Sequence, residues 1–272
     1  MSAQPPAGAA PGRTDGLFGP ESVTRRIMGQ PVMWTAGFRA MYLQMLHPRV
    51  MRGTWQNTAF ADPHEAWGRF MRTVEYVRTR NFGSAAEAER AGRRVRKIHA
   101  SLTGTDPDGT QFRLDEPELL LWVHCGEVAS YADIARRSGL PVSPGDLDTF
   151  VAEQRRGAAL VGLDPGIVPA SMADLQTYYR ELRPRLQMTP EARQALLRSI
   201  GLALPDALAP IKLVMPSLAA LGFGSLPRWA RRLYHLPGIP VTDLAVTAAL
   251  RACHEGLTRM PADLLVTVPR AA

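Results

Sequence analysis

The sequence predicts an all-α protein, and three observations carry that prediction. Apolar residues recur three and four positions apart over long stretches, which places them on one face of an α-helix. Helix-capping residues precede most of these stretches, often with Glu or Asp three positions further on. No stretch alternates convincingly between apolar and polar residues, apart from a possible short ribbon around residues 110–114.

The first long predicted helix covers residues 63–80. Asp62 is the expected N-cap, Pro63 the first helical residue and Glu65 the second member of a capping box. One face is apolar and a nearly opposite face is polar, with Trp67, Phe70, Met71, Val74 and Val77 on the first and Arg69, Arg72, Thr73 and Tyr76 on the second. Periodicity alone predicts that the polar face lies in solvent.

The second predicted helix covers residues 84–103, beginning with a capping box of Ser84 and Glu87 and ending at Gly104. Its apolar residues recur at helical spacing: Ala88, Ala91, Val95, Ile98 and Leu102. His99 lies on or beside this core-facing stripe. A buried histidine needs a partner, and the sequence leaves two interpretations open: a neutral ring bonded to a carbonyl group, or a metal ligand.

The third predicted helix, residues 116–135, is expected to use Asp115 and Glu118 as its capping pair. It begins with a run of apolar residues that covers its whole circumference, so we expect it to be buried. His124 and Glu127 share one stripe of this helix and lie one turn apart. They either bond to each other or line a binding site, and the sequence leaves both interpretations open.

Several later helices follow from similar patterns. Ser171 and Thr189 are the expected N-caps of helices over residues 171–182 and 189–200. Weaker patterns indicate helices near 146–160, 205–221, 226–235 and 241–258. His47, directly before Pro48, is expected to end a helix.

The chain is expected to form one helical domain over residues 19–262. A leader rich in Pro, Ala and Gly precedes it at 1–18, and a short tail follows it at 263–272. The leader lacks the apolar run of a signal peptide, and prolines break the longest apolar stretch of the chain. We therefore expect a cytoplasmic protein without a membrane span.

Composition and missing motifs exclude several functions. The 272 residues, 46% hydrophobic and 21% charged, are typical of a globular protein. The net charge is +7, but the arginines are interleaved with acidic residues and no nucleic-acid-binding motif occurs, which disfavours nucleic acid as a partner. The two cysteines form no CxxC or CxxCH motif, which disfavours a cysteine zinc site and covalently attached haem, so buried free thiols are expected. Paired Glu-x-x-His motifs of a diiron bundle are absent.

An ordered set of motifs resembles one known family. The motifs are "FADPHEAWGRFMRTVEYV", "NFGSAAEAERAGRRVRKIHASLTG", "DEPELLLWVH" and "YYREL". In this order they resemble the MpaB-type oxygenase family (DUF2236), which is related to the catalytic domain of latex-clearing rubber oxygenases. The resemblance runs from about residue 19 to 262. It implies a single globin-like, all-α domain that encloses a pocket for non-covalently bound haem b.

The resemblance also implies roles for individual residues. His99 matches the histidine that binds the haem iron, and Arg69 and Thr73 match an Arg and a Thr of the haem pocket. The resemblance therefore changes one expectation: the polar face of helix 63–80 should lie against the cofactor rather than in solvent. Arg72 stands where the rubber oxygenases have a lysine that can bind the iron, which a guanidinium cannot do because it has no lone pair. His124 is the rival ligand.

The expected function is a haem b-dependent oxidoreductase of the oxygenase or oxidase type. Its substrate would be a small apolar or aromatic metabolite of secondary metabolism, with oxygen or peroxide as oxidant and, where the reaction needs one, an electron donor. His124, Glu127 and Arg72 are the expected catalytic groups. The alternatives are a non-catalytic protein that binds haem or a small molecule, and a haem-free interaction module.

Two departures from the family pattern leave the substrate open. The chain has Gln56 and Asn57 in a segment where relatives usually carry His, and Cys125, Gly126 and Glu127 follow "WVH" in place of small or aliphatic residues. Rubber cleavage is disfavoured, because the rubber oxygenases are typically secreted and no export signal is recognised here.

Overall fold

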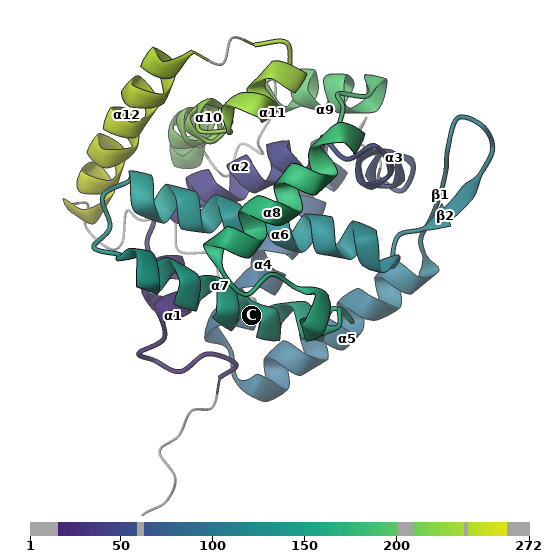
Figure 1. The fold of residues 1–272 in the computed structure, drawn as a ribbon, viewed down its shortest axis with the longest axis horizontal. Coiled ribbons are helices and arrows are strands. Elements are labelled where there is room, and N and C mark those ends of the chain that lie inside the picture. The colour runs from purple at the N-terminus through teal and green to yellow at the C-terminus, as the bar shows by residue number, and fades with distance from the viewer. Residues whose placement is uncertain (1–15, 59–62, 201–208, 237–238, 260–272) are drawn as a thin grey trace, which may run out of the picture.

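A computed structural model of the chain describes residues 16–58, 63–200, 209–236 and 239–259. These residues form twelve α-helices, two short 3-10 turns and one two-stranded sheet, so the all-α prediction is confirmed (Figure 1). The first half contains α1 (Val23–Met28), α2 (Met33–Gln44), α3 (Pro48–Gln56), α4 (Pro63–Phe82), α5 (Ala85–Ser101), β1 (Thr103–Thr105) and β2 (Gln111–Arg113). The second half contains α6 (Pro117–Arg137), α7 (Pro144–Leu160), α8 (Met172–Leu182), α9 (Pro190–Ile200), α10 (Ala209–Gly224), α11 (Arg228–Leu233) and α12 (Pro240–Arg259).

Helix α6 is the centre of the fold, as its apolar start predicts. It crosses the middle of the molecule and packs along α2, whose other side is covered by α10 (Figure 1). Trp122 of α6 is fully buried, and its indole N–H donates a hydrogen bond of 3.1 Å to the carbonyl oxygen of Gln44. Cys125 is buried and Cys253 is partly buried, and both are free thiols. None of the described helices is long and apolar enough to cross a membrane.

Most of the predicted helix starts are confirmed. Ser84 and Glu87 form the expected capping box of α5. Ser171 accepts a hydrogen bond from the Asp174 N–H at the start of α8, and Thr189 caps α9 by accepting one from Ala192. Asp62, the expected cap of α4, lies outside the described residues.

The predicted capping pair of α6 is wrong. The helix begins at Pro117, one residue later than predicted, so Glu116 is the N-cap, and its side chain makes no capping bond. Asp115 instead binds Arg113 through two hydrogen bonds of 2.6 and 2.8 Å.

The predicted end of the second helix is also wrong. Helix α5 ends at Ser101, and Gly104 lies in β1, where it pairs with Phe112 of β2. This close pairing explains the glycine, since a Cβ at that position would overlap the Phe112 ring. The hairpin confirms the predicted ribbon, and it projects from one side of the helical body (Figure 1). Ile98, expected in the core, is 46% exposed.

Of the N-terminal helices α1–α3, the sequence predicted only that a helix ends at His47, and it gave no bounds for any of the three. His47 begins a helix rather than ending one: its Nδ1 accepts a hydrogen bond of 3.4 Å from the Val50 N–H, and Pro48 follows as the first residue of α3. Of the predicted leader the structure describes residues 16–18, and Phe18 is fully buried. The predicted tail lies outside the described residues.

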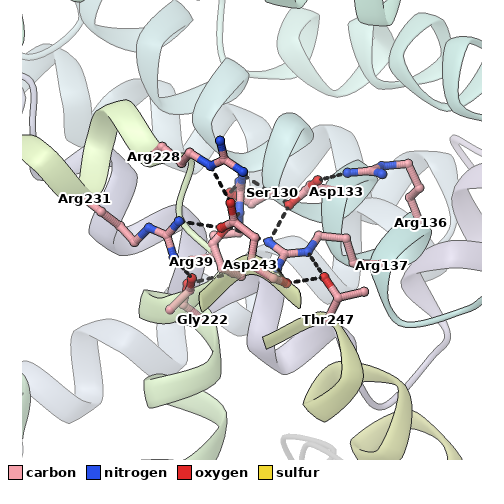
Figure 2. A network of polar contacts seen from close by, with 12 residues as sticks. Arg39, Ser130, Asp133, Arg136, Arg137, Gly222, Arg228, Arg231, Asp243 and Thr247 are labelled. Atoms are coloured by element: carbon pink, nitrogen blue, oxygen red, sulfur yellow. Dashed lines mark hydrogen bonds and ion pairs between the residues drawn. The ribbon is translucent and has the colours of Figure 1, made fainter. Parts of the chain in front are cut away.

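A network of buried arginines fixes the C-terminal helices to the centre of the fold (Figure 2). Arg39 of α2 and Arg137 of α6 both donate to the Ser225 carbonyl oxygen, at 3.4 and 3.0 Å. Arg231 of α11 binds Asp243 of α12. Ser225 directly follows α10, so these cations lie at the negative end of its helix dipole. The network therefore joins five helices: α2, α6, α10, α11 and α12.

Candidate functional site

His99 lies on α5, beside helix α4. Helix α5 approaches α7 closely at Gly92, where a Cβ would lie 2.7 Å from the Leu160 carbonyl oxygen. The His99 Nδ1 atom is buried and has no hydrogen-bond partner among the described residues. Burial lowers the pKa of His99, and the positive charge of Arg69 lowers it further. The structure thus leaves a histidine nitrogen without the carbonyl partner that one sequence interpretation expected.

Arg69 of α4 is a partly buried cation near His99. It donates a hydrogen bond to the Thr58 hydroxyl group and forms no ion pair with a described carboxylate. Burial lowers the pKa of Arg69, and Arg72 lowers it further. A cation withdrawn from water without a counter-ion is destabilising, so this position favours the binding of an anionic group.

Arg72 and Thr73 lie on the same face of α4 as Arg69, but their side chains are exposed. The Thr73 hydroxyl group donates to the Arg69 carbonyl oxygen at 3.2 Å, a common bond within a helix. Both residues remain accessible to a group bound beside Arg69.

A second buried polar group joins α4 to α6. Arg80 of α4 is 3% exposed, and its Nη2 and Nη1 atoms donate to the two Glu127 carboxylate oxygens at 2.6 and 3.3 Å. Nη2 also approaches the Gln154 Oε1 atom at 3.4 Å. The interpretation in which His124 and Glu127 bond to each other is therefore wrong, because Arg80 is the partner of Glu127.

His124 is buried beside this ion pair and is 6% exposed. Burial lowers the pKa of His124 to about 4, against the opposing effect of the Glu127 charge. The ring is therefore neutral near pH 7. It makes no hydrogen bond with the residues described here. A neutral imidazole can bind a metal or accept a proton, so both roles expected for His124 remain chemically available.

Sequence reasoning missed Arg80 and Gln154. Arg80 could have been found, because it follows Tyr76 by four residues and extends the polar face of α4 by one turn. Gln154 comes from α7 and carries no comparable signal. A cavity of about 280 Å³ lies elsewhere, beside α8, and none of the predicted site residues lines it.

The residues around His99 fit haem b. Among the described residues no cluster of three or more His, Cys, Asp or Glu side chains could hold a metal alone. A cofactor that supplies most of its own metal ligands needs only one protein histidine. The free Nδ1 of His99 and the unpaired charge of Arg69 match an iron centre with carboxylate substituents.

Residues 25–255 match one protein family, described as ER-bound oxygenase mpaB/B′/rubber oxygenase, catalytic domain. The match runs from α1 into α12 and includes every candidate site residue. No curated protein and no solved structure matches the chain.

Proposed function

The chain belongs to the family of mpaB-type and rubber oxygenase catalytic domains, and from this premise we propose that it is a haem b-dependent oxygenase. An oxygenase is an oxidoreductase. Its oxidant would be oxygen or peroxide, and its substrate a small molecule. The observation that carries the haem proposal is the pair His99 and Arg69: a buried nitrogen and a neighbouring cation, neither of which has a partner of the required kind among the residues that the structure describes.

The residues that would hold the cofactor lie on α4 and α5. His99 would bind the iron, Arg69 would pair with a haem carboxylate through a charge-assisted hydrogen bond, and Thr73 would add a small polar contact. When bound, haem supplies the redox chemistry with oxygen or peroxide. Arg72 cannot bind the iron, since its guanidinium has no lone pair, so its role would be to place a positive charge beside the reacting groups.

His124 is the group best placed to move protons. Its ring is neutral at pH 7 and can accept a proton at one nitrogen while it donates from the other. The charge of Glu127 raises the pKa of His124 and so favours proton uptake, while Arg80 opposes it. In this proposal His124 is the group that transfers the proton, and Glu127 acts on it only through its negative charge.

The proposed substrate is a small apolar or aromatic metabolite of secondary metabolism. Leu120 and Val128, one turn on either side of His124, are both buried and apolar. These two side chains supply the apolar part of the surroundings of His124, next to the Arg80–Glu127 ion pair.

Oxygen or peroxide consumption by the haem-loaded protein tests the proposal. Consumption with a panel of small aromatic compounds, and its reduction in His124→Gln, is the expected result. A haem-loaded protein that consumes neither oxidant would be a haem-binding protein instead.

A further inference from the structure

Tyr76 of α4 has a buried hydroxyl group without a hydrogen-bond acceptor among the described residues, because the Arg80 guanidinium beside it can only donate. Buried tyrosine hydroxyl groups usually have a partner, because the cost of removing them from water is otherwise uncompensated. Burial raises the pKa of Tyr76, so the group is a protonated phenol that can donate. The residue therefore needs an acceptor that the described chain does not provide.

Arg80 adds a second unused donor at the same place. Its guanidinium carbon lies 5.7 Å from the centre of the Tyr76 ring, and its Nε–H is buried without a partner. The Nη atoms of Arg80 are already bound to Glu127 and Gln154. Two donors without acceptors, one of them on a guanidinium, suit a carboxylate oxygen best among ligand groups.

Tyr76 also lies on the face of α4 that carries Arg69 and Thr73. Seven residues separate Arg69 from Tyr76, which is about 10 Å along a helix axis. The face thus presents two separate points for acidic groups: at one end a cation without a counter-ion, and at the other a phenol without an acceptor, within the described part of the chain.

We propose that the Tyr76 hydroxyl group donates a hydrogen bond to a carboxylate of the bound cofactor, the second carboxylate besides the one that Arg69 binds. This inference rests on the proposed function, because it takes haem b as the ligand. A carboxylate of the substrate has the same chemistry, and the experiment distinguishes the two.

The test compares Tyr76→Phe with Tyr178→Phe. Tyr178 is a matched control, because its hydroxyl group is also buried without a described partner but lies on α8. The measurements are the thermal midpoint of the haem-free chain and the rate at which loaded protein loses haem to excess apomyoglobin. Both are repeated with haem dimethyl ester, whose carboxylates are blocked.

We expect Tyr76→Phe to leave the haem-free midpoint unchanged or higher, since it removes an unsatisfied group. Haem should then leave about tenfold faster, while loss of the dimethyl ester is unchanged. Tyr178→Phe should alter neither rate.

Three results would overturn the inference. Unchanged haem loss would mean that Tyr76 does not contact the cofactor and would point to the substrate. If haem and its dimethyl ester are both lost faster to the same extent, Tyr76 contributes only by packing against the cofactor. A lowered thermal midpoint of the haem-free chain would mean that the Tyr76 hydroxyl group already has a partner, either a protein group or a bound water. If the wild-type chain binds no haem at all, the proposed function itself is wrong.

Discussion

Replacing Glu127 by Gln tests whether the Arg80–Glu127 pair stabilises the fold as a buried ion pair. The side chains of Arg80 and Glu127 are 4% and 15% exposed. Glutamine keeps the shape of the side chain and one acceptor oxygen, but removes the negative charge. The Arg80 guanidinium stays protonated and would remain buried without a counter-ion.

The expected cost follows from this geometry. Removing one partner of a buried ion pair costs about 3–5 kcal/mol, and the hydrogen bond that Gln retains offsets about 1 kcal/mol of that. We therefore expect the free energy of unfolding to fall by about 2–4 kcal/mol. Glu75→Gln is the control: Glu75 binds Arg78 at 2.6 and 2.8 Å, but both side chains are 38% exposed. An exposed pair of this kind contributes about 0–1 kcal/mol.

Urea unfolding followed by circular dichroism measures both variants under the same conditions. The midpoint should fall clearly for Glu127→Gln and by little for Glu75→Gln, with the slopes of the transitions unchanged. Equal midpoints for the two variants would refute the reasoning, because burial is what distinguishes the pairs.

Further predictions concern the cofactor, the packing and the pH dependence. His99→Ala should lose haem, whereas His124→Ala should keep haem and change turnover. Absorption spectra of the two variants measure the bound haem, and the reverse pattern would mean that His124 is the iron ligand. Gly92→Ala should destabilise the fold by about 1–3 kcal/mol, because its Cβ would meet the α7 backbone, while Gly256→Ala, with nothing within 4 Å, should be neutral or stabilising. Hydrogen bonds from the N-cap serine of α7 lower the pKa of Asp146 to about 2. Because the pKa of Asp146 is depressed in the folded chain, its contribution to the free energy of unfolding is present above about pH 4 and is lost as the pH falls toward 2. Between these pH values the urea midpoint should therefore fall less for Asp146→Asn than for the wild-type chain.

Local capping chemistry explains why so much of the helical fold could be predicted. Ser84, Ser171 and Thr189 accept hydrogen bonds from backbone N–H groups three residues away. Such helix starts can therefore be recognised in a short stretch of sequence. Helices α2 and α3 lack this signal. The N-cap of α2 is Val32, which makes no side-chain bond, and that of α3 is His47, an unusual capping residue.

The site was predicted less completely, because its contacts connect distant segments. Arg80 and Glu127 are 47 residues apart in the sequence, so no local pattern indicates that the fold brings their side chains together. On α5 the apolar pattern placed Ile98 in the core, where it does not lie, and missed Gly92, at which the helix approaches α7 closely. His99 lies on or beside the apolar stripe of α5, and at such a position the spacing of apolar residues does not predict whether the side chain is buried.

The absorption spectrum of the purified chain, prepared with a supply of haem, tests the central claim most directly. We expect one non-covalent haem b per chain, extractable with acid and ketone, since the sequence has no CxxCH motif. Arg72 has no lone pair to offer the iron, so unless His124 binds it as well, the ferric protein should be high-spin and should bind imidazole or cyanide readily. A chain that shows no Soret band after reconstitution with haem would contradict the account.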